Sequence, residues 1–63
     1  MKLRELVERI STADEVVVNV YDDEFFLIAR ADGKDTIPDT LLEMNVGFIY
    51  PADKGQINVE VEI

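Results

Sequence analysis

Carboxylates are the side chains of this sequence best suited to chemistry, because the chain has 14 Asp and Glu but no His and no Cys. Three are consecutive, at Asp22, Asp23 and Glu24, and two alternate near the C-terminus, at Glu60 and Glu62. Groups of carboxylates can transfer protons, bind a metal ion or bind a basic partner. The spacing and the surrounding residues decide among these functions.

Catalysis is the least favoured function. Without His or Cys, the chain lacks the side chain that transfers protons near neutral pH and the most reactive nucleophile. The hydroxyl groups of Ser11, Thr12, Thr36 and Thr40 have no evident base beside them. A chain of 63 residues also has little material with which to enclose a substrate. We therefore expect a protein that is not an enzyme and needs no cofactor.

A metal site is also disfavoured. Calcium takes about six to eight oxygen ligands, usually from a loop of alternating acidic residues. Neither residues 22–24 nor the group Asp32, Asp35 and Asp39 has that spacing. A polar turn and a capped helix start explain the two groups better, and the three isolated glycines form no phosphate-binding loop.

The charge is unevenly distributed along the chain. The net charge is -8, and residues 1–13 carry +1 while residues 14–63 carry -9. This excess disfavours direct binding to nucleic acid or to an anionic membrane and favours a protein partner with a basic surface. No apolar run approaches the roughly 20 residues of a membrane span, and the first residues lack the apolar core of a secretion signal. We expect a soluble, cytoplasmic protein.

The acidic residues suggest a binding surface. Alternate strand residues such as Glu60 and Glu62 project from one face about 6.6 to 6.8 Å apart. Together with Asp22, Asp23 and Glu24, such a row can imitate the phosphates of a nucleic acid and occupy a basic groove on another protein. An acid excess of this size also keeps a small domain soluble without any binding role, and the sequence leaves both explanations open.

The first segment has the pattern of an amphipathic helix. Leu3, Leu6, Val7 and Ile10 follow the i, i+3, i+4, i+7 spacing, which predicts a helix over residues 2–11. A helix this short is marginal in isolation, so its apolar stripe must pack against a sheet.

Two strands are expected next, over residues 16–21 and 24–30, with Asp22 and Asp23 as a two-residue turn. That turn pairs residue 20 with 25, residue 18 with 27 and residue 16 with 29. The expected core face consists of Val16, Val18, Val20, Phe25, Leu27 and Ala29.

The second face of this hairpin is also partly apolar. Val17 is expected beside Ile28, and Asn19 beside Phe26. Sheets that are apolar on both faces need cover on both. Either the short second helix covers Val17, Phe26 and Ile28, or these residues form an interface in a homodimer or with a partner.

The second half repeats the order of helix and hairpin. A short helix is expected over residues 37–44, with Thr36 as its N-cap. Strands are expected over residues 46–50 and 57–63, joined by a turn at 52–56. In this register Ile49 lies opposite Val59, and a loop one residue longer or shorter would reverse the faces. Pro51 indicates an edge strand.

These elements predict a single α+β domain over residues 1–63. We expect a small, four-stranded, mainly antiparallel sheet in the order helix, hairpin, short helix, hairpin, with the N-terminal helix packed on one face.

Residues 1–31, a short charged helix followed by an acidic strand pair, resemble the opening of small phage and prophage proteins, including acidic anti-CRISPR inhibitors of type II nucleases. The resemblance implies a phage-encoded inhibitor in the host cytoplasm whose acidic residues occupy the groove that reads DNA. Carried over, it points to Asp22, Asp23 and Glu24. The chain is shorter than the best-known members and lacks their long acidic C-terminal helices, which leaves the target open.

The leading hypothesis is therefore a non-enzymatic acidic interaction protein, of the kind phages encode, that binds a basic surface of a host protein and mimics nucleic acid. The alternative is a small homodimerising or structural module that uses an apolar sheet face.

Overall fold

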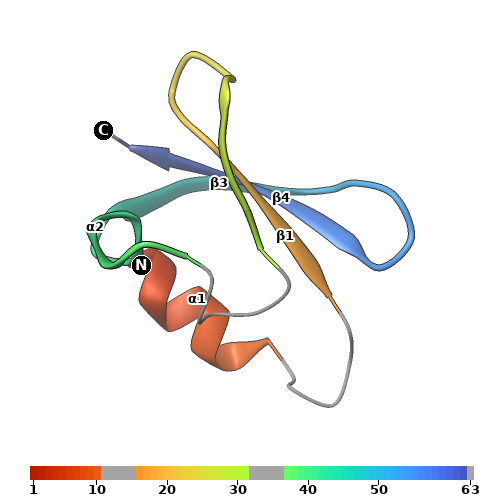
Figure 1. Cartoon of the computed structure of the whole chain (residues 1–63), viewed down its shortest axis with the longest axis horizontal. Coiled ribbons are helices and arrows are strands. Elements are labelled where there is room, and N and C mark those ends of the chain that lie inside the picture. Colours follow the sequence, from red (N-terminus) through yellow and green to blue (C-terminus); the bar gives the residue numbers. More distant parts are fainter. Residues whose placement is uncertain (11–15, 32–36, 63) are drawn as a thin grey trace.

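The computed structural model describes residues 1–10, 16–31 and 37–62 and has the α+β fold expected from the sequence. A four-stranded sheet is accompanied by a seven-residue helix and a shorter one (Figure 1). The elements are α1 (Leu3–Arg9), β1 (Val17–Tyr21), β2 (Leu27–Ala31), α2 (Asp39–Leu42), β3 (Asn45–Pro51) and β4 (Gln56–Glu62).

The strands lie in the order β2-β1-β4-β3. Each hairpin is antiparallel, and the two hairpins join through a parallel pairing of the central strands β1 and β4. This pairing places β2 and β3 at the two edges of the sheet. Pro51, which lacks a backbone donor, ends β3 as expected for an edge strand.

Helix α1 begins and ends close to the expected bounds. Before its first residue, the backbone N–H of Lys2 donates a hydrogen bond of 3.0 Å to the Glu5 carboxylate. The helix stops at Arg9, because Ile10 has extended backbone angles. Leu3 and Val7 are buried, which confirms the apolar stripe.

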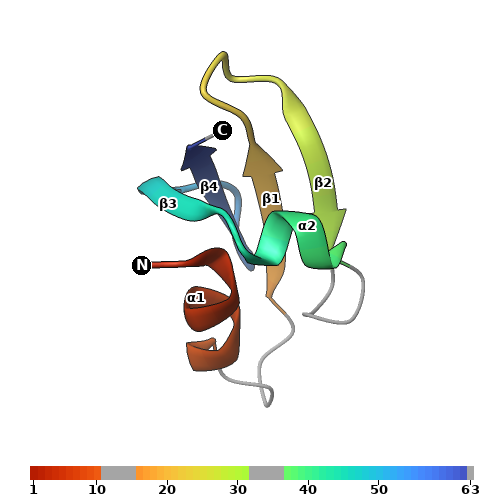
Figure 2. The ribbon, with the colours of Figure 1, turned by 90° about the vertical axis from the view of Figure 1, so that its left-hand side faces the viewer.

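Both helices cover the same face of the sheet (Figure 2). One hydrophobic cluster contains residues from α1, from the segment of α2 and from three strands. Its buried members are Leu3, Val7, Val18, Val20, Ala31, Ile37, Leu42, Val59 and Val61. The sequence left open whether the short helix or an interface covers the second face of the first hairpin. Because α2 packs on the same face as α1, it does not cover that second face.

The register expected for the first hairpin is wrong. Val18 pairs with Ala31 and Val20 pairs with Ala29, so β2 lies four residues further along the chain than a two-residue turn would place it. The favoured two-residue turns need positive φ at one or both central residues, usually with a Gly there, and Asp22-Asp23 contains no Gly. The chain instead uses residues 22–26 as a longer connection.

The side chain of Asp22 organises this connection. Its Oδ1 accepts hydrogen bonds from the backbone N–H groups of Glu24 at 2.9 Å and Phe26 at 3.0 Å. Phe25 then takes a left-handed conformation, with φ of 65°. Phe25 was expected in the core, but it lies outside the strand and is 65% exposed.

Of the registers that the sequence left open for the second hairpin, the chain adopts the one with Ile49 opposite Val59. Gln56 donates a backbone hydrogen bond of 2.8 Å to Asp53, and the positive φ of 76° at Gly55 allows this tight turn. Near the start of β3 the ladder skips Gly47. Because Ile49 lies opposite the buried Val59, its neighbours Phe48 and Tyr50 are on the other face of the sheet, which the helices do not cover.

The second helix is shorter than the expected 37–44, because α2 begins after Pro38 and ends at Leu42. The expected N-cap, Thr36, lies outside the described residues. Glu43, just after α2, forms ion pairs of 2.9 Å with both Lys2 and Arg4. Hydrogen bonds from Lys2 and then Arg4 hold the pKa of the Glu43 carboxyl below its usual range.

The Glu43 ion pairs should make stability depend on acid pH. Because the folded pKa is lowered, they stabilise the fold fully above about pH 4.3, the ordinary value for Glu, and this contribution is lost as the pH falls through the folded pKa. The difference in unfolding free energy between the wild type and Glu43→Gln should therefore shrink below that pH in urea denaturation. Glu8→Gln, at an exposed position of α1 outside the Glu43 ion pairs, is the control for the removal of one carboxylate.

Candidate functional site

The candidate site lies on the face of the sheet opposite the helices, which we call the open face. Two rows of paired residues cross it. Phe48, Glu60 and Tyr21 form one row across β3, β4 and β1. Tyr50, Asn58, Asn19 and Arg30 form the next row and extend it to β2.

A polar network forms part of the floor of the open face. Asn19 is only 7% exposed, and its Nδ2 donates hydrogen bonds of 3.1 Å to both Gln56 Oε1 and Asn58 Oδ1. These bonds satisfy a buried amide that would otherwise destabilise the fold. The network therefore joins the side chains of β1 and β4 beneath the open face.

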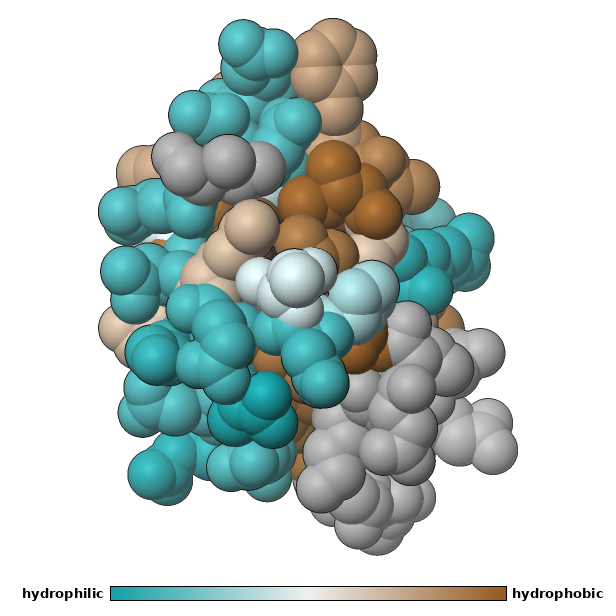
Figure 3. Space-filling view, turned by 60° about the vertical axis from the view of Figure 1, so that its left-hand side comes forward, coloured by the Kyte–Doolittle hydropathy of each residue, from teal (hydrophilic) through white to brown (hydrophobic). Residues whose placement is uncertain are grey.

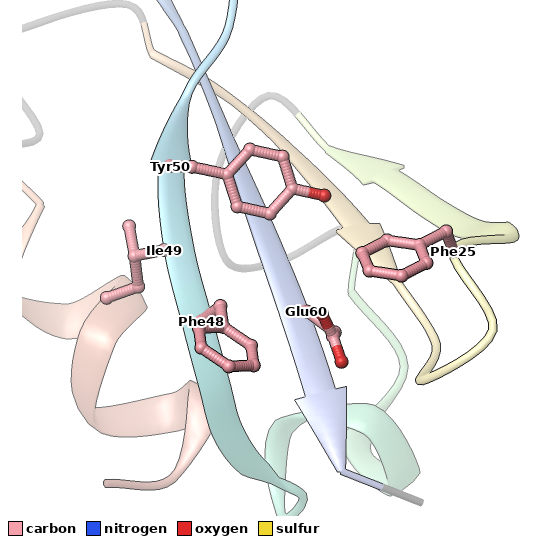
Figure 4. A pocket seen from close by; sticks show the side chains of 5 residues that line it. All are labelled: Phe25, Phe48, Ile49, Tyr50 and Glu60. Atoms are coloured by element: carbon pink, nitrogen blue, oxygen red, sulfur yellow. The ribbon is translucent and has the colours of Figure 1, made fainter.

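Aromatic rings surround a hollow of about 300 Å³ beside this network. Figure 4 shows the rings of Phe48 and Tyr50 reaching from β3 and the ring of Phe25 from the β1–β2 connection, with the Glu60 carboxylate between them. Ile49 borders the hollow because it lies between Phe48 and Tyr50 on β3. Its side chain points away from the hollow, toward α1. The hollow therefore combines aromatic walls with one carboxylate.

Glu60 is the unusual member of this group. It is 8% exposed, while Phe25 and Phe48 beside it are each 65% exposed. Within residues 1–10, 16–31 and 37–62, its carboxylate makes no hydrogen bond or ion pair with another side chain. Because no described basic side chain pairs with it, this carboxylate is available to a positively charged ligand.

The five acidic residues singled out from the sequence do not form one continuous surface. Asp22 holds the β1–β2 connection, and Asp23 and Glu24 are exposed in that same connection. Glu60 lines the hollow, and Glu62 is exposed at the end of β4. Glu60 and Glu62 project from the same face of β4 as expected, but Glu60 is only 8% exposed, so the two do not form a row of exposed carboxylates.

The apolar residues singled out from the sequence are also separated. Val17 pairs with Gln56 of β4, not with Ile28, and is partly buried. Phe26 is 64% exposed in the connection, not beside Asn19, and Ile28 is 37% exposed on β2. Figure 3 shows apolar side chains gathered over β2 and the connection before it, bordered by polar ones.

No protein-family model, curated protein or solved structure matches this chain. Across the described ranges, no three acidic side chains converge to hold a metal ion. None of the described helices is long and apolar enough to cross a membrane. Asp32 and Asp35, from the second acidic group in the sequence, lie outside the described residues.

One contribution to the site was within reach of sequence reasoning, and another was not. The register that pairs Ile49 with Val59 also places Phe48 beside Glu60, and this register was one of the alternatives that the alternating pattern left open. Phe25 reaches the hollow only because the β1–β2 connection is longer than a two-residue turn. The signal for that connection was Asp22, whose side chain can bind backbone N–H groups two residues ahead.

Replacing Asp22 should therefore affect the conformation of Phe25. Asp22→Ala removes two hydrogen bonds to the backbone and should lower the unfolding free energy by about 1–2 kcal/mol in urea denaturation. Asp23→Ala, at the adjacent exposed position, should change it by less than about 0.5 kcal/mol. Equal effects of the two substitutions would contradict the role assigned to Asp22.

Proposed function

We propose that this chain is a non-enzymatic interaction protein that binds a basic surface of a protein partner through its open face. The observation that carries the proposal is the Glu60 carboxylate, which lies among exposed aromatic rings on a sheet face that no described helix covers. Aromatic residues are frequent anchors at protein interfaces, and a shielded carboxylate selects a positive charge.

The distribution of charge supports the same proposal. Lys2 and Arg4, on the helix side of the sheet, are already paired with Glu43. Asp23 and Glu24 are exposed in the connection that also supplies Phe25 to the hollow. A net charge of -8 attracts a basic partner at long range, and exposed carboxylates near the contact strengthen that attraction.

A basic protein surface fits this arrangement better than imitation of a nucleic acid does. Nucleic-acid imitation needs a regular row of exposed charges, and Glu60 and Asp22 do not belong to such a row. Aromatic rings beside a carboxylate are instead suited to individual basic side chains.

The test is capture of partners on the immobilised chain from a lysate of the cells that carry its gene. Asp23→Asn/Glu24→Gln should reduce the amount captured about tenfold, because the contact loses two exposed charges. Raising the salt from about 0.1 M to 0.5 M should release the wild-type complex, since surface charges are then screened. Quantitative mass spectrometry measures both effects.

The matched control is Glu8→Gln/Asp53→Asn, which changes the net charge equally at exposed positions of α1 and the β3–β4 turn. It should retain capture within about twofold. Capture that is unaffected by salt, or equal for both double variants, would contradict binding through the acidic connection and the open face.

A homodimer through β2 is the second candidate. It is supported by Phe26, Leu27 and Ile28, which are exposed in or beside an edge strand whose outer side pairs with no described strand. An apolar interface should hold or tighten as salt is raised, opposite to the behaviour of a charged one.

The dimer is tested by the mass of the particle in solution. If β2 forms the interface, the wild type should sediment as a dimer at high protein concentration and Phe26→Glu as a monomer, because a buried charge opposes association. A wild type that remains monomeric under these conditions would exclude this candidate.

A further inference from the structure

The geometry points to the hollow around Glu60 as a receptor for one arginine side chain of the partner protein. This inference rests on the proposed function and specifies its central contact. The guanidinium group pairs with the Glu60 carboxylate, while the rings of Phe25, Phe48 and Tyr50 contact its faces and its aliphatic stem.

The first argument is charge. Glu60 is 8% exposed, and no described basic side chain compensates its carboxylate. Arg30 shares the open face, but it lies in the row of Asn19 and forms no ion pair with Glu60. An apolar ligand would remove the remaining water from the carboxylate without replacing its charge, which is unfavourable. A cation supplies what the hollow lacks.

The second argument is shape. The hollow has a volume of about 300 Å³ and is walled by three rings that come from two separate parts of the chain. A guanidinium is planar, weakly hydrated and able to stack on aromatic faces while pairing with a carboxylate. A lysine ammonium is compact and strongly hydrated, so it uses aromatic walls less well. The hollow therefore favours arginine over lysine.

The third argument is the backbone of Phe25. A φ of 65° is unfavourable for a residue with a bulky side chain, and such strain is often found at binding sites. The two hydrogen bonds to Asp22 Oδ1 hold this conformation, yet the ring of Phe25 is 65% exposed and contributes nothing to the core. The strained backbone places the Phe25 ring where it can form one wall of a ligand-binding hollow.

The direct test is titration of the isotopically labelled full chain with Nα-acetyl-arginine amide, followed by NMR. The resonances of Phe48, Tyr50 and Glu60 should shift and saturate, with a Kd on the order of millimolar. The citrulline analogue, which has nearly the same shape but no charge, should cause no saturable shift. The lysine analogue should bind at least about threefold more weakly than arginine.

Two pairs of variants assign the contact. Glu60→Gln should weaken arginine binding about tenfold, while Glu62→Gln, the next open-face carboxylate on the same strand, should stay within about twofold. Phe48→Ala should weaken binding several-fold because it removes one wall. Both Glu60→Gln and Phe48→Ala change side chains that lie on the open face, outside the core, so both variants should remain folded. Circular dichroism is the control for folding.

The arginine receptor is refuted by any of three results: no saturable shift with arginine, equal affinity in Glu60→Gln and the wild type, or tighter binding of the lysine or citrulline analogue. These results are separable from the capture experiment. Salt-sensitive capture that depends on Asp23 and Glu24, combined with no arginine binding, would remove the receptor and leave the proposed function intact. Arginine binding that depends on Glu60, without partner capture, would support the receptor and remove the proposed function.

Discussion

Burial on only one face of the sheet is the constraint on which the rest of this structure depends. Two short helices supply one apolar layer, and all nine buried apolar residues of the described core belong to a single cluster. A chain of 63 residues has too little material for a third layer, because small domains bury only about 60% of their surface. The open face therefore meets water, and it combines polar side chains such as Asn19 and Asn58 with exposed apolar ones such as Phe48.

This constraint explains why Glu60 is both shielded and outside the core. Val59 and Val61 point into the core, so the alternation of β4 places Glu60 on the open face. There it is 8% exposed beside the aromatic rings of the hollow, and no described helix covers it. A carboxylate that is shielded in this way remains within reach of a ligand that approaches from solvent. A carboxylate in the core would be inaccessible.

The parts of the fold that follow local patterns could be predicted, and the parts that depend on distant or side-chain-specific contacts could not. The apolar spacing of Leu3 and Val7 defines α1, and the alternation around Val59 defines the second hairpin. The first hairpin was misaligned because the Asp22 side chain, not a two-residue turn, determines how the chain reverses. The parallel pairing of β1 with β4 joins segments almost 40 residues apart, and no local pattern reports it. The site follows the same division, since the neighbours of Glu60 on β3 were among the alternatives that the sequence left open and Phe25 was not.

Charge acts on two length scales in this molecule, and the two scales have separate consequences for binding. Asp23 and Glu24 are exposed, so at physiological salt their influence decays over about 8 Å and mainly affects the rate at which a partner arrives. Glu60 is 8% exposed, so its pairing with the proposed guanidinium is screened less by salt and mainly affects how long the proposed partner stays. The ion pairs of Lys2 and Arg4 with Glu43 keep two of the chain's six basic residues engaged near the helices. The proposed steering groups, Asp23 and Glu24, and the proposed anchoring group, Glu60, thus lie on or beside the face of the sheet that no described helix covers.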